Sequence, residues 1–413
     1  MANPIRIVIV GGGFGGIQTL KNLHQILHGD QRVEISLINE QNYFLFTPLL
    51  HEVATGGINP ENIIEPIRNI LGCCVDSFYL GKAESINLIN QNVKIGNREL
   101  PYDYLVLAPG AETNFYGITG VREHCFTLKS LEDAIKIKNH CIDRLERVSC
   151  IEDREKRKNL LRFVVVGGGA TGVELAAELQ EFLKETFSGY YAPEIIEDVS
   201  VILVERGGEL LAPFGKKTRE KSLKFLEKKG VKVMLNTKVK EVTASEITFD
   251  SGETLFSESI IWVAGIKPAD LRFDQPVLKD SAGRIIVDEY LQLVNHKGVF
   301  ALGDIASFKQ KDAVLPALAQ VATKESKTVA NNIKLLINEK NLQAFSYKHS
   351  GYLLSLGRWM AVGEIKNFNF SGRFTWWIWR TVYLSKLPSF RKKIEVVFDW
   401  TMNIFSPRDI SKI

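Results

Sequence analysis

Two glycine-rich segments contain the residues best suited to bind a charged cofactor. Residues 5–20 read IRIVIVGGGFGGIQTL, and Gly11, Gly13 and Gly16 stand at GxGxxG spacing directly after a β-branched run. In such a loop the first glycine makes the turn, the second lets the backbone approach phosphate oxygens, and the third lets the following helix pack on the strand. A helical pattern of apolar residues follows the loop: Ile17, Leu20, Leu23 and Leu27.

The same arrangement recurs later in the chain. Residues 163–172 read FVVVGGGATG, with Gly167, Gly169 and Gly172 at the same spacing, and a helical pattern follows again. Two such loops predict two dinucleotide sites, each at the start of a helix.

The strand that follows each loop ends in a carboxylate. These carboxylates are Glu40, after VEISLIN, and Glu205, after VSVILV. A carboxylate at this place can hold the ribose diol of a dinucleotide. Glu205 favours NADH over NADPH because it would repel a 2′-phosphate, although the neighbouring Arg206 could soften that preference.

Three further segments place the loops within an α/β fold. YDYLVLAPGAETN (102–114) and ESIIWVAGIKP (258–268) are matching strand–turn segments, and each is expected to close one nucleotide-binding domain. GVFALGDIA (298–306) adds a strand that ends in Gly303 and Asp304. The chain is therefore expected to be α/β, with two Rossmann-like dinucleotide-binding domains.

With these segments the chain resembles the two-dinucleotide-binding-domain flavoproteins of the glutathione reductase type. The resemblance implies that the second Rossmann-like domain is inserted in the first and that Asp304 binds the ribityl chain of FAD. The first loop would then bind FAD and the second NADH. The expected parts are an FAD domain over 1–120 and 275–345, an NADH domain over 121–274, and a C-terminal membrane-association and dimerisation segment over 346–413.

The cysteines argue against thiol chemistry at the flavin. Disulfide reductases of this type carry a CxxxxC motif after the first nucleotide unit, but residues 41–59 read QNYFLFTPLLHEVATGGIN. Sulfide-oxidising relatives need cysteines late in the chain, and the last cysteine here is Cys150. The adjacent pair Cys73–Cys74 and the odd total of five indicate reduced thiols in a cytosol.

Three motifs resemble those of the type II NADH:quinone oxidoreductases: NYFLFTPLLHEVATG, GGGATGVELAAEL and PALAQVATKES. The resemblance covers essentially the whole chain. It implies transfer of hydride from NADH to FAD, and of two electrons on to a membrane quinone, without proton pumping. Two alternatives stay open: a soluble NAD(P)H:ferredoxin or rubredoxin reductase, and a flavin-bound redox sensor or interaction protein.

The resemblance also assigns the site residues. The two expected to be catalytic are Glu174 and Gln320. The residues expected to bind the cofactors are Gly11, Gly13, Phe14, Gly15, Gly16, Glu40, Thr47, Ala83, Ala108, Gly110, Gly303, Asp304, Ala319, Gln320, Gly167, Gly169, Ala170, Thr171, Gly172, Glu174, Glu205 and Gly265.

Glu174 follows the second loop by two residues, where its charge should repel phosphates. As an acid in the first turn of the helix it would gain about 0.3–1 kcal/mol from the helix dipole. The resemblance implies a different role, in which the carboxyl projects beyond the phosphates toward the contact between nicotinamide and isoalloxazine. Desolvation there should raise its pKa, so that it could relay a proton or hold the nicotinamide carboxamide.

Gln320 belongs to a segment whose helix is predicted to begin at Pro316. The resemblance implies that the positive end of this helix stabilises the reduced flavin and that Gln320 donates a hydrogen bond to the quinone head group. The alternative is a solvated glutamine on the helix face. The family commonly carries AQxAxQ, whereas Lys324 stands in the last place here, which leaves the quinone type open.

The C-terminal segment combines aromatic and basic residues. From residue 371 onward there are eight Lys and Arg against three Asp and Glu, although the whole chain has a net charge of only +4. Two amphipathic helices are predicted, broken at Pro388 and ended near Pro407, and neither is long enough to span a membrane. They suit docking on an anionic membrane surface, and packing on the body or on a second subunit is the alternative. The first would align Trp376, Trp379, Tyr383 and Leu387, and the second Ile394, Val397, Phe398, Thr401 and Phe405, with Glu395, Asp399 and Asn403 opposite.

The composition is that of an ordinary globular protein. With 413 residues, 45% of them hydrophobic, the chain can form two or more domains without metal or disulfide support. The N-terminus shows no secretory signal, and no stretch approaches the length of a membrane span. We therefore expect a peripheral membrane protein facing the cytoplasm, a homodimer with NADH and a membrane quinone as substrates, and neither a metal nor a nucleic-acid partner.

Overall fold

The computed structural model describes residues 4–71, 77–366 and 368–412. The chain divides into two compact units. Unit 1 consists of Met1–Phe44, Glu65–Glu112 and Ile266–His349, and unit 2 consists of Leu45–Ile64, Thr113–Gly265 and Ser350–Ile413. The pair Cys73–Cys74 lies outside the described residues, and the domain boundaries expected from the sequence stay a prediction.

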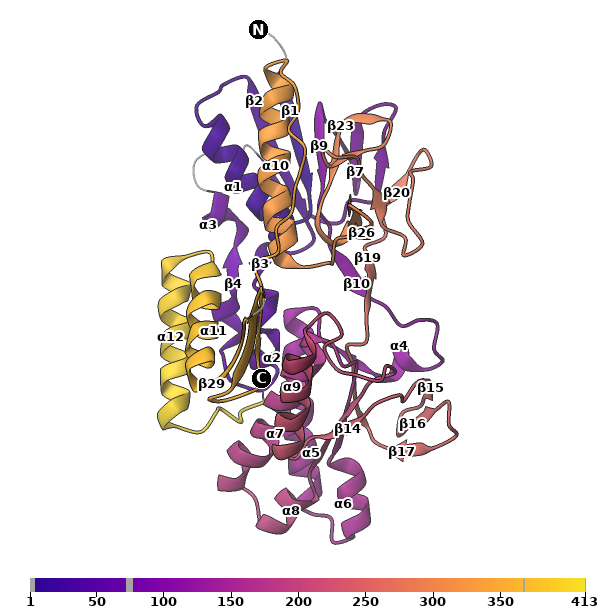
Figure 1. The fold of residues 1–413 in the computed structure, drawn as a ribbon, viewed down its shortest axis with the longest axis vertical. Coiled ribbons are helices and arrows are strands. Elements are labelled where there is room, and N and C mark those ends of the chain that lie inside the picture. The colour runs from indigo at the N-terminus through magenta and orange to yellow at the C-terminus, as the bar shows by residue number, and fades with distance from the viewer. Residues whose placement is uncertain (1–3, 72–76, 367, 413) are drawn as a thin grey trace. The chain divides into compact units, whose positions relative to one another are not determined.

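A six-stranded sheet is the framework of unit 1 (Figure 1). In order across the sheet, its strands are β22 (Gln292–Leu293), β23 (His296–Ala301), β9 (Tyr104–Leu107), β1 (Ile5–Val10), β2 (Val33–Asn39) and β5 (Ser77–Leu80). Neighbouring strands are parallel, except that β22 runs antiparallel to β23. The β-branched run predicted as a strand is β1, and its last four residues are buried, as expected of an inner parallel strand.

Two long helices lie side by side in unit 1, α1 (Phe14–Leu27) and α10 (Ala319–Ile337) (Figure 1). The apolar face predicted for α1 is confirmed, because all four of its residues are buried: Ile17, Leu20, Leu23 and Leu27. The shorter elements of unit 1 are α3 (Ile67–Leu71), β6 (Ser85–Asn87), β7 (Asn92–Ile95), β8 (Arg98–Pro101), β20 (Arg272–Phe273), β21 (Ile285–Ile286), η5 (Gly303–Ile305), β24 (Ala306–Ser307), β25 (Lys309–Gln310) and β26 (Ala313–Val314). Four short strands stand where the chain passes from one unit to the other: β3 (Tyr43–Leu45), β4 (Ile64–Pro66), β10 (Ala111–Thr113) and β19 (Ile266–Pro268).

Unit 2 contains a five-stranded parallel sheet. Its strands, in order, are β11 (Phe126–Thr127), β18 (Ser259–Trp262), β12 (Arg162–Val166), β13 (Ser200–Val204) and β14 (Lys232–Met234). Its helices up to residue 230 are η1 (Thr47–Leu49), α2 (Leu50–Val53), η2 (Pro60–Ile63), α4 (Val121–His124), α5 (Leu131–Val148), α6 (Arg154–Leu160), α7 (Ala170–Glu181), η3 (Phe182–Thr186), η4 (Phe187–Gly189), α8 (Pro193–Asp198) and α9 (Lys216–Lys228). A separate antiparallel sheet is formed by β15 (Val239–Val242), β16 (Glu246–Phe249) and β17 (Thr254–Phe256). The predicted α/β character is therefore confirmed in both units.

The C-terminal part of unit 2 is a three-stranded antiparallel sheet followed by two helices (Figure 1). Its elements are β27 (Tyr352–Ser355), β28 (Ala361–Ile365), β29 (Phe368–Gly372), α11 (Arg373–Lys386) and α12 (Phe390–Phe405). The two predicted helices are confirmed, because the break falls at Pro388 and the second helix ends just before Pro407. Among the described residues, no helix has both the length and the apolar character that crossing a membrane requires.

Helix α12 buries Val396, Asp399 and Trp400 against the protein. The Asp399 carboxylate accepts hydrogen bonds from the Asn59 backbone N–H at 3.0 Å and from the side-chain amides of Asn59 and Asn62, both at 2.7 Å. The opposite side of the helix is apolar and exposed: Phe390, Ile394, Val397, Phe398, Met402 and Phe405. This set, called the exposed apolar face below, contains most of the stripe that the sequence predicted for this helix.

Two cations of the C-terminal segment are directed into the protein. The guanidinium carbon of Arg380 lies 3.6 Å from the ring centre of Trp376 and 4.6 Å from that of Trp400. Arg408 forms ion pairs with buried carboxylates of α7. Both residues belong to the basic excess that was expected to meet a membrane surface, so their inward contacts correct that expectation.

Candidate functional site

The first glycine loop leaves β1 through a tight turn that only glycine can form. Gly11 has φ +104°, and a Cβ there would lie 2.2 Å from the carbonyl oxygen of Ala108. A Cβ on Gly16 would lie 1.8 Å from the carbonyl oxygen of Gly11. At Gly13, by contrast, an added Cβ would meet no heavy atom of the described chain within 4 Å. The loop is therefore closely packed against its own strand and open at its middle glycine.

The second loop has the same geometry in unit 2. Gly167 has φ +121°, and its Cβ would lie 2.7 Å from the Ala264 Cα. A Cβ on Gly172 would lie 1.8 Å from the carbonyl oxygen of Gly167, whereas around Gly169 the described residues leave the space open to 4 Å. The matching strand–turn segments predicted from the sequence supply Ala108 and Ala264, which pack behind the two loops.

Both loops fit the pyrophosphate of a dinucleotide. Helices α1 and α7 begin at the loops, and the described part of the chain supplies neither a side-chain cap nor a first-turn acid for either helix. The first N–H groups of such a helix can bind an anion, and the open side of each middle glycine gives phosphate oxygens room to approach.

The carboxylate after the second loop is fixed by the loop itself. Glu205 accepts hydrogen bonds from the backbone N–H of Gly168 at 2.7 Å and of Gly207 at 2.6 Å. In unit 1 the corresponding bond, from the backbone N–H of Gly12, goes to the Asn39 side chain at 2.7 Å. Strand register makes Asn39 the counterpart of Glu205, so Glu40, which the sequence analysis paired with Glu205, stands one residue later and is exposed. Counting the register from the glycine loops would have identified Asn39.

The Gly303–Asp304 turn is held by a residue that the sequence analysis did not single out. The backbone N–H of Gly303 donates to the carboxylate of Glu325 on α10 at 2.7 Å. Burial raises the pKa of Glu325 to about 7. Glu325 therefore fixes the turn that carries Asp304, the residue expected to bind the ribityl chain.

Helix α10 begins later than predicted, at Ala319 rather than Pro316. Leu318, just before the helix, is extended, and the backbone N–H of Leu315 donates to the Phe308 carbonyl at 3.0 Å. Gln320 is consequently the second residue of the helix. Lys324 lies over the Tyr347 ring, with Nζ 4.8 Å from the ring centre.

Glu174 is the fifth residue of α7, so it lies in the second turn and not in the first turn that the sequence analysis assumed. The dipole of a helix acts mainly within the first turn, so it does not account for this carboxylate. Its Oε1 accepts a hydrogen bond from the Ser355 backbone N–H at 3.1 Å, and its Oε2 lies 4.0 Å from the His51 Nδ1. Burial raises the pKa of Glu174 well above its usual value, and Glu52 and Glu178 raise it further.

Glu174 belongs to a row of buried acids on one face of α7. Glu178 and Glu181 follow at i+4 and i+7, and all three are buried. We call Glu174, Glu178 and Glu181 the acidic stripe. The pattern is visible in VELAAELQE, although only its first member, Glu174, was predicted as a site residue.

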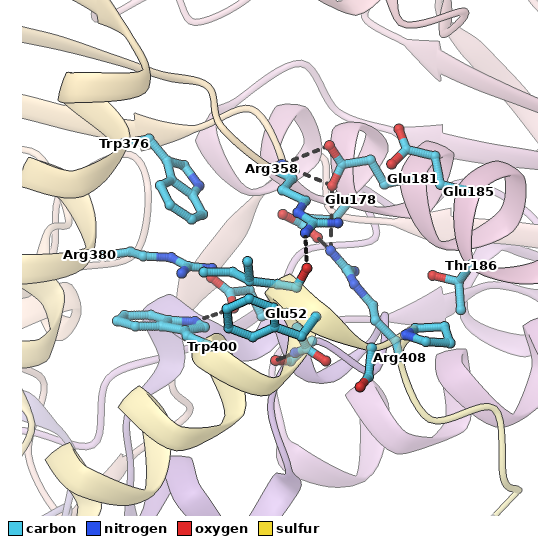
Figure 2. Close-up of a pocket in the computed structure, with 16 residues that line it drawn as sticks. Glu52, Glu178, Glu181, Glu185, Thr186, Arg358, Trp376, Arg380, Trp400 and Arg408 are labelled. Carbon is cyan, nitrogen blue, oxygen red and sulfur yellow. Dashed lines mark hydrogen bonds and ion pairs between the residues drawn. The ribbon is translucent and has the colours of Figure 1, made fainter.

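The far end of the acidic stripe lines a pocket of about 250 Å³ (Figure 2). Arg408 reaches into it and pairs with Glu178 at 2.6 Å and with Glu181 at 3.4 Å. Glu181 also forms an ion pair with Lys229 and accepts the Arg358 backbone N–H. On another wall, the Trp400 indole donates to Glu52 at 2.7 Å, as Figure 2 shows.

The protonation of this cluster follows from burial and from Arg408. Burial raises the pKa of Glu52 to about 7, and Glu178 adds to that shift. Burial likewise lowers the pKa of His51 to about 4, so its imidazole is neutral near pH 7. Burial also opposes ionisation of Glu178, but Arg408, together with His51 and Lys229, outweighs it, so the pKa of Glu178 is lowered.

Glu52→Gln should make the protein more stable relative to wild type as pH rises. In the wild type the unfolded chain loses this proton near pH 4.5 whereas the folded chain keeps it until about pH 7, so unfolding becomes easier across that interval. At about 1.4 kcal/mol per pKa unit, the variant should gain up to about 3 kcal/mol between pH 4.5 and 8. Urea unfolding of both proteins at several pH values measures this, and parallel curves would contradict the shift.

The expected site residues fall into two groups. Those in unit 1 are Gly11, Gly13, Phe14, Gly15, Gly16, Glu40, Ala83, Ala108, Gly110, Gly303, Asp304, Ala319 and Gln320. Those in unit 2 are Thr47, Gly167, Gly169, Ala170, Thr171, Gly172, Glu174, Glu205 and Gly265. Within unit 1 Gly11 packs on Ala108, and within unit 2 Gly167 packs on Ala264 while the neighbouring Gly168 N–H bonds to Glu205. The assignment of all these residues to cofactors stays a prediction.

Comparison with known proteins identifies the family. Residues 5–326 match the pyridine nucleotide-disulphide oxidoreductase family, and residues 349–409 match the NDH2 C-terminal domain. A probable NADH dehydrogenase of Dictyostelium discoideum is 34% identical over 98% of this chain and 91% of its own. A type II NADH:quinone oxidoreductase of Mycobacterium tuberculosis is 32% identical over 98% of this chain and 89% of its own.

Solved structures show the same fold. The structure of NDH2 from Plasmodium falciparum in complex with NADH has a TM-score of 0.90 at 23% identity and covers 99% of this chain and all of its own. A sulfide:quinone oxidoreductase from Aquifex aeolicus has a TM-score of 0.74 at 19% identity, covering 97% of this chain and 95% of its own. The family resemblance read from the three motifs is confirmed: the chain belongs to the pyridine nucleotide-disulphide oxidoreductases and, among them, to the type II NADH:quinone oxidoreductases.

Proposed function

We propose that this protein is an FAD-dependent enzyme that oxidises NADH and reduces a membrane quinone. The observation that carries the proposal is the pair of equivalent glycine loops, one in each unit and each open at its middle glycine. The relatives named as an NADH dehydrogenase and a type II NADH:quinone oxidoreductase match nearly the whole chain, which supports the same activity. The absence of proton pumping stays a prediction, and the quinone type stays open.

We propose that each unit binds one of the two cofactors. In unit 1 the Gly11–Gly16 loop and Asp304 would hold FAD, and in unit 2 the Gly167–Gly172 loop and Glu205 would hold NADH. Bound flavin supplies the exchange of two electrons between a hydride donor and a quinone. Glu205 is held by two backbone N–H groups, so a 2′-phosphate would meet a fixed negative charge, which favours NADH. Glu174 and Gln320 are proposed as the residues that handle protons and the quinone head group.

The activity test compares electron acceptors. Purified protein loaded with FAD should oxidise NADH with a water-soluble quinone and produce one quinol per NADH. A ferredoxin or rubredoxin reductase would oxidise NADH with an iron protein in preference to quinone, and a redox sensor would bind NADH with little turnover. Either result would contradict the proposal.

The exposed apolar face of α12 supports docking on a membrane surface. Phe390, Phe398 and Phe405 are 78%, 63% and 81% exposed, whereas Asp399 on the opposite side anchors the helix to the protein. Removing such a face from water lowers the free energy by about 25 cal/mol per Å² of apolar area. Three exposed cations lie on α11 and α12 and can meet anionic headgroups: Arg373, Lys386 and Arg391. The cytoplasmic orientation and the homodimer stay predictions from the sequence.

Phe398→Glu should weaken binding to vesicles that contain anionic lipid by about tenfold or more, because it places a charge in the buried part of the interface. Co-sedimentation with vesicles measures this. Phe256→Glu is the matched control, since Phe256 is 51% exposed on β17, outside the C-terminal segment. Deleting residues 371–413 is the weaker experiment, because it would also remove Asp399, Trp400 and Arg408 from the interior of unit 2. If wild type and Phe398→Glu bind vesicles equally while Phe398→Glu changes the oligomeric state, the face is a subunit interface and the docking proposal is wrong.

A further inference from the structure

Reduction of a quinone requires a proton from water. NADH supplies two electrons and one proton as hydride, and the quinol carries two protons, so each turnover takes up one further proton from solvent. Glu174 is proposed to handle protons, yet its side chain is only 11% exposed. A buried carboxyl that gives up a proton in every turnover needs a route by which it is protonated again.

The pocket at the end of the acidic stripe provides an entrance for that proton. Its rim includes exposed residues, Glu185, Phe405, Ser406 and Pro407, so it opens to solvent. Its volume of about 250 Å³ and its polar walls suit water. Glu178 lies four residues from Glu174 along α7, which is about 6 Å along the helix axis. The pocket therefore ends one helical turn from Glu174.

Two titratable residues of α2 lie between the pocket and Glu174. Glu52 lines the pocket, is only 6% exposed, and has one carboxylate oxygen fixed by the Trp400 indole. The next residue back along the chain, His51, is 3% exposed, and its Nδ1 lies 4.0 Å from the Glu174 carboxylate. The structure gives His51 Nε2 no hydrogen-bond partner among the described residues, although it is buried. Buried polar atoms of this kind are usually bridged by water.

The remaining charged groups around these residues set the electrostatic field. Glu178 and Glu181 are paired with Arg408, and Glu181 also with Lys229. Arg408 lowers the pKa of Glu178 and so favours its ionised form, and burial lowers the pKa of Lys229 to about 7. The negative charge of Glu178 then favours the protonated form of Glu52 and Glu174. The other groups that face the route are Arg358 and Arg380 from the pocket wall and Tyr383 from α11.

We propose that Glu52 and His51 carry protons from the pocket to Glu174, with bridging water, so that quinone reduction draws its solvent proton through unit 2. This inference rests on the proposed quinone reductase function. In each transfer, Glu52 takes a proton from pocket water and passes one on through His51, and Glu174 regains the proton that it lost. Charge and protons balance, because every group returns to its starting state and one water-derived proton enters the quinol.

Glu52→Gln tests the route, because glutamine keeps the shape and the Trp400 hydrogen bond but cannot carry a proton. Quinone reduction should slow by about tenfold or more, and its solvent isotope effect should rise. NADH oxidation with ferricyanide, which accepts an electron without a proton, should keep its rate. His51→Gln should give the same split between acceptors. Glu185→Gln is the matched control, since Glu185 lines the same pocket at its rim, and it should change neither rate.

A second measurement does not depend on turnover. Infrared spectra of the wild type at about pH 6 should contain the carbonyl band of a buried carboxylic acid that shifts in heavy water, and Glu52→Gln should lose part of it. The proposal is overturned if Glu52→Gln keeps the quinone rate and isotope effect, if both acceptors slow equally, or if the infrared band is unchanged. A wild-type protein that oxidises NADH with ferricyanide but reduces no quinone would instead overturn the proposed function.

Discussion

Arg408→Met should lower the free energy of unfolding by about 3–5 kcal/mol, because it leaves a buried carboxylate without its cation. The Arg408 side chain is 14% exposed, and Glu178 and Glu181 are each 5% exposed. Glu181 keeps Lys229 when Arg408 is lost, whereas the only ion pair that the structure shows for Glu178 within the described chain is the one with Arg408. Chemical denaturation of the FAD-loaded protein measures the loss.

The loss should be largest near neutral pH. Arg408 holds the pKa of Glu178 low against the effect of burial, so the stability from this pair is present above the ordinary carboxyl range and is lost as pH falls through the lowered value. In Arg408→Met the largest influence that lowers this pKa is gone, so burial raises it and Glu178 takes up a proton more readily. The difference between variant and wild type should therefore shrink as pH falls from about 7 to about 4.

Two further variants decide whether the buried pair is responsible. Lys412→Met removes a cation a few residues away that pairs with Asp143, but that pair is 55% and 43% exposed, so the change should cost at most about 1 kcal/mol. Adding Glu178→Gln to Arg408→Met should recover much of the loss, because the unpaired charge is then gone. Equal effects of Arg408→Met and Lys412→Met would contradict the buried ion pair.

The glycine loops could be read from the sequence because their requirements are local. Each loop needs a turn with positive φ and a backbone contact too close to leave room for a Cβ. Both requirements depend on a few neighbouring residues, and glycine alone meets both. The break at Pro388 was equally local. The start of α10 was not, because Leu315 bonds to Phe308, seven residues back, and the helix begins only at Ala319.

The buried charges could not be read in the same way. Arg408 and Asp399 lie in a segment that looks like a solvated or membrane-bound tail, and their partners, Glu178 and Asn59, are far away in the sequence. A charged residue in a tail is normally exposed, so only the tertiary structure shows that these two hold the C-terminal helices to unit 2. His51 and Glu52 stood within a recognised motif, yet nothing in their spacing indicates that they lie beside Glu174.

The second prediction with a large effect concerns the last glycine of the NADH loop. Gly172→Ala would place a Cβ 1.8 Å from the carbonyl oxygen of Gly167, a backbone atom that cannot move without opening the turn. Overpacking of this kind costs about 1–3 kcal/mol or more, and an opened loop no longer presents its N–H groups to phosphate. We expect lower thermal stability and at least a tenfold rise in the KM for NADH, with FAD still bound.

Gly169→Ala separates binding from folding in the same loop. Its Cβ would enter space that the described residues leave open, so stability should stay within about 0.5 kcal/mol of wild type. The methyl group would still stand where the backbone must approach the pyrophosphate, so NADH should bind more weakly. Wild-type NADH affinity in both variants would mean that this loop binds no dinucleotide. Gly16→Ala completes the comparison, because its Cβ meets the Gly11 carbonyl oxygen at the same 1.8 Å. It should release FAD, and if it weakened only NADH binding, the assignment of the two loops would have to be exchanged.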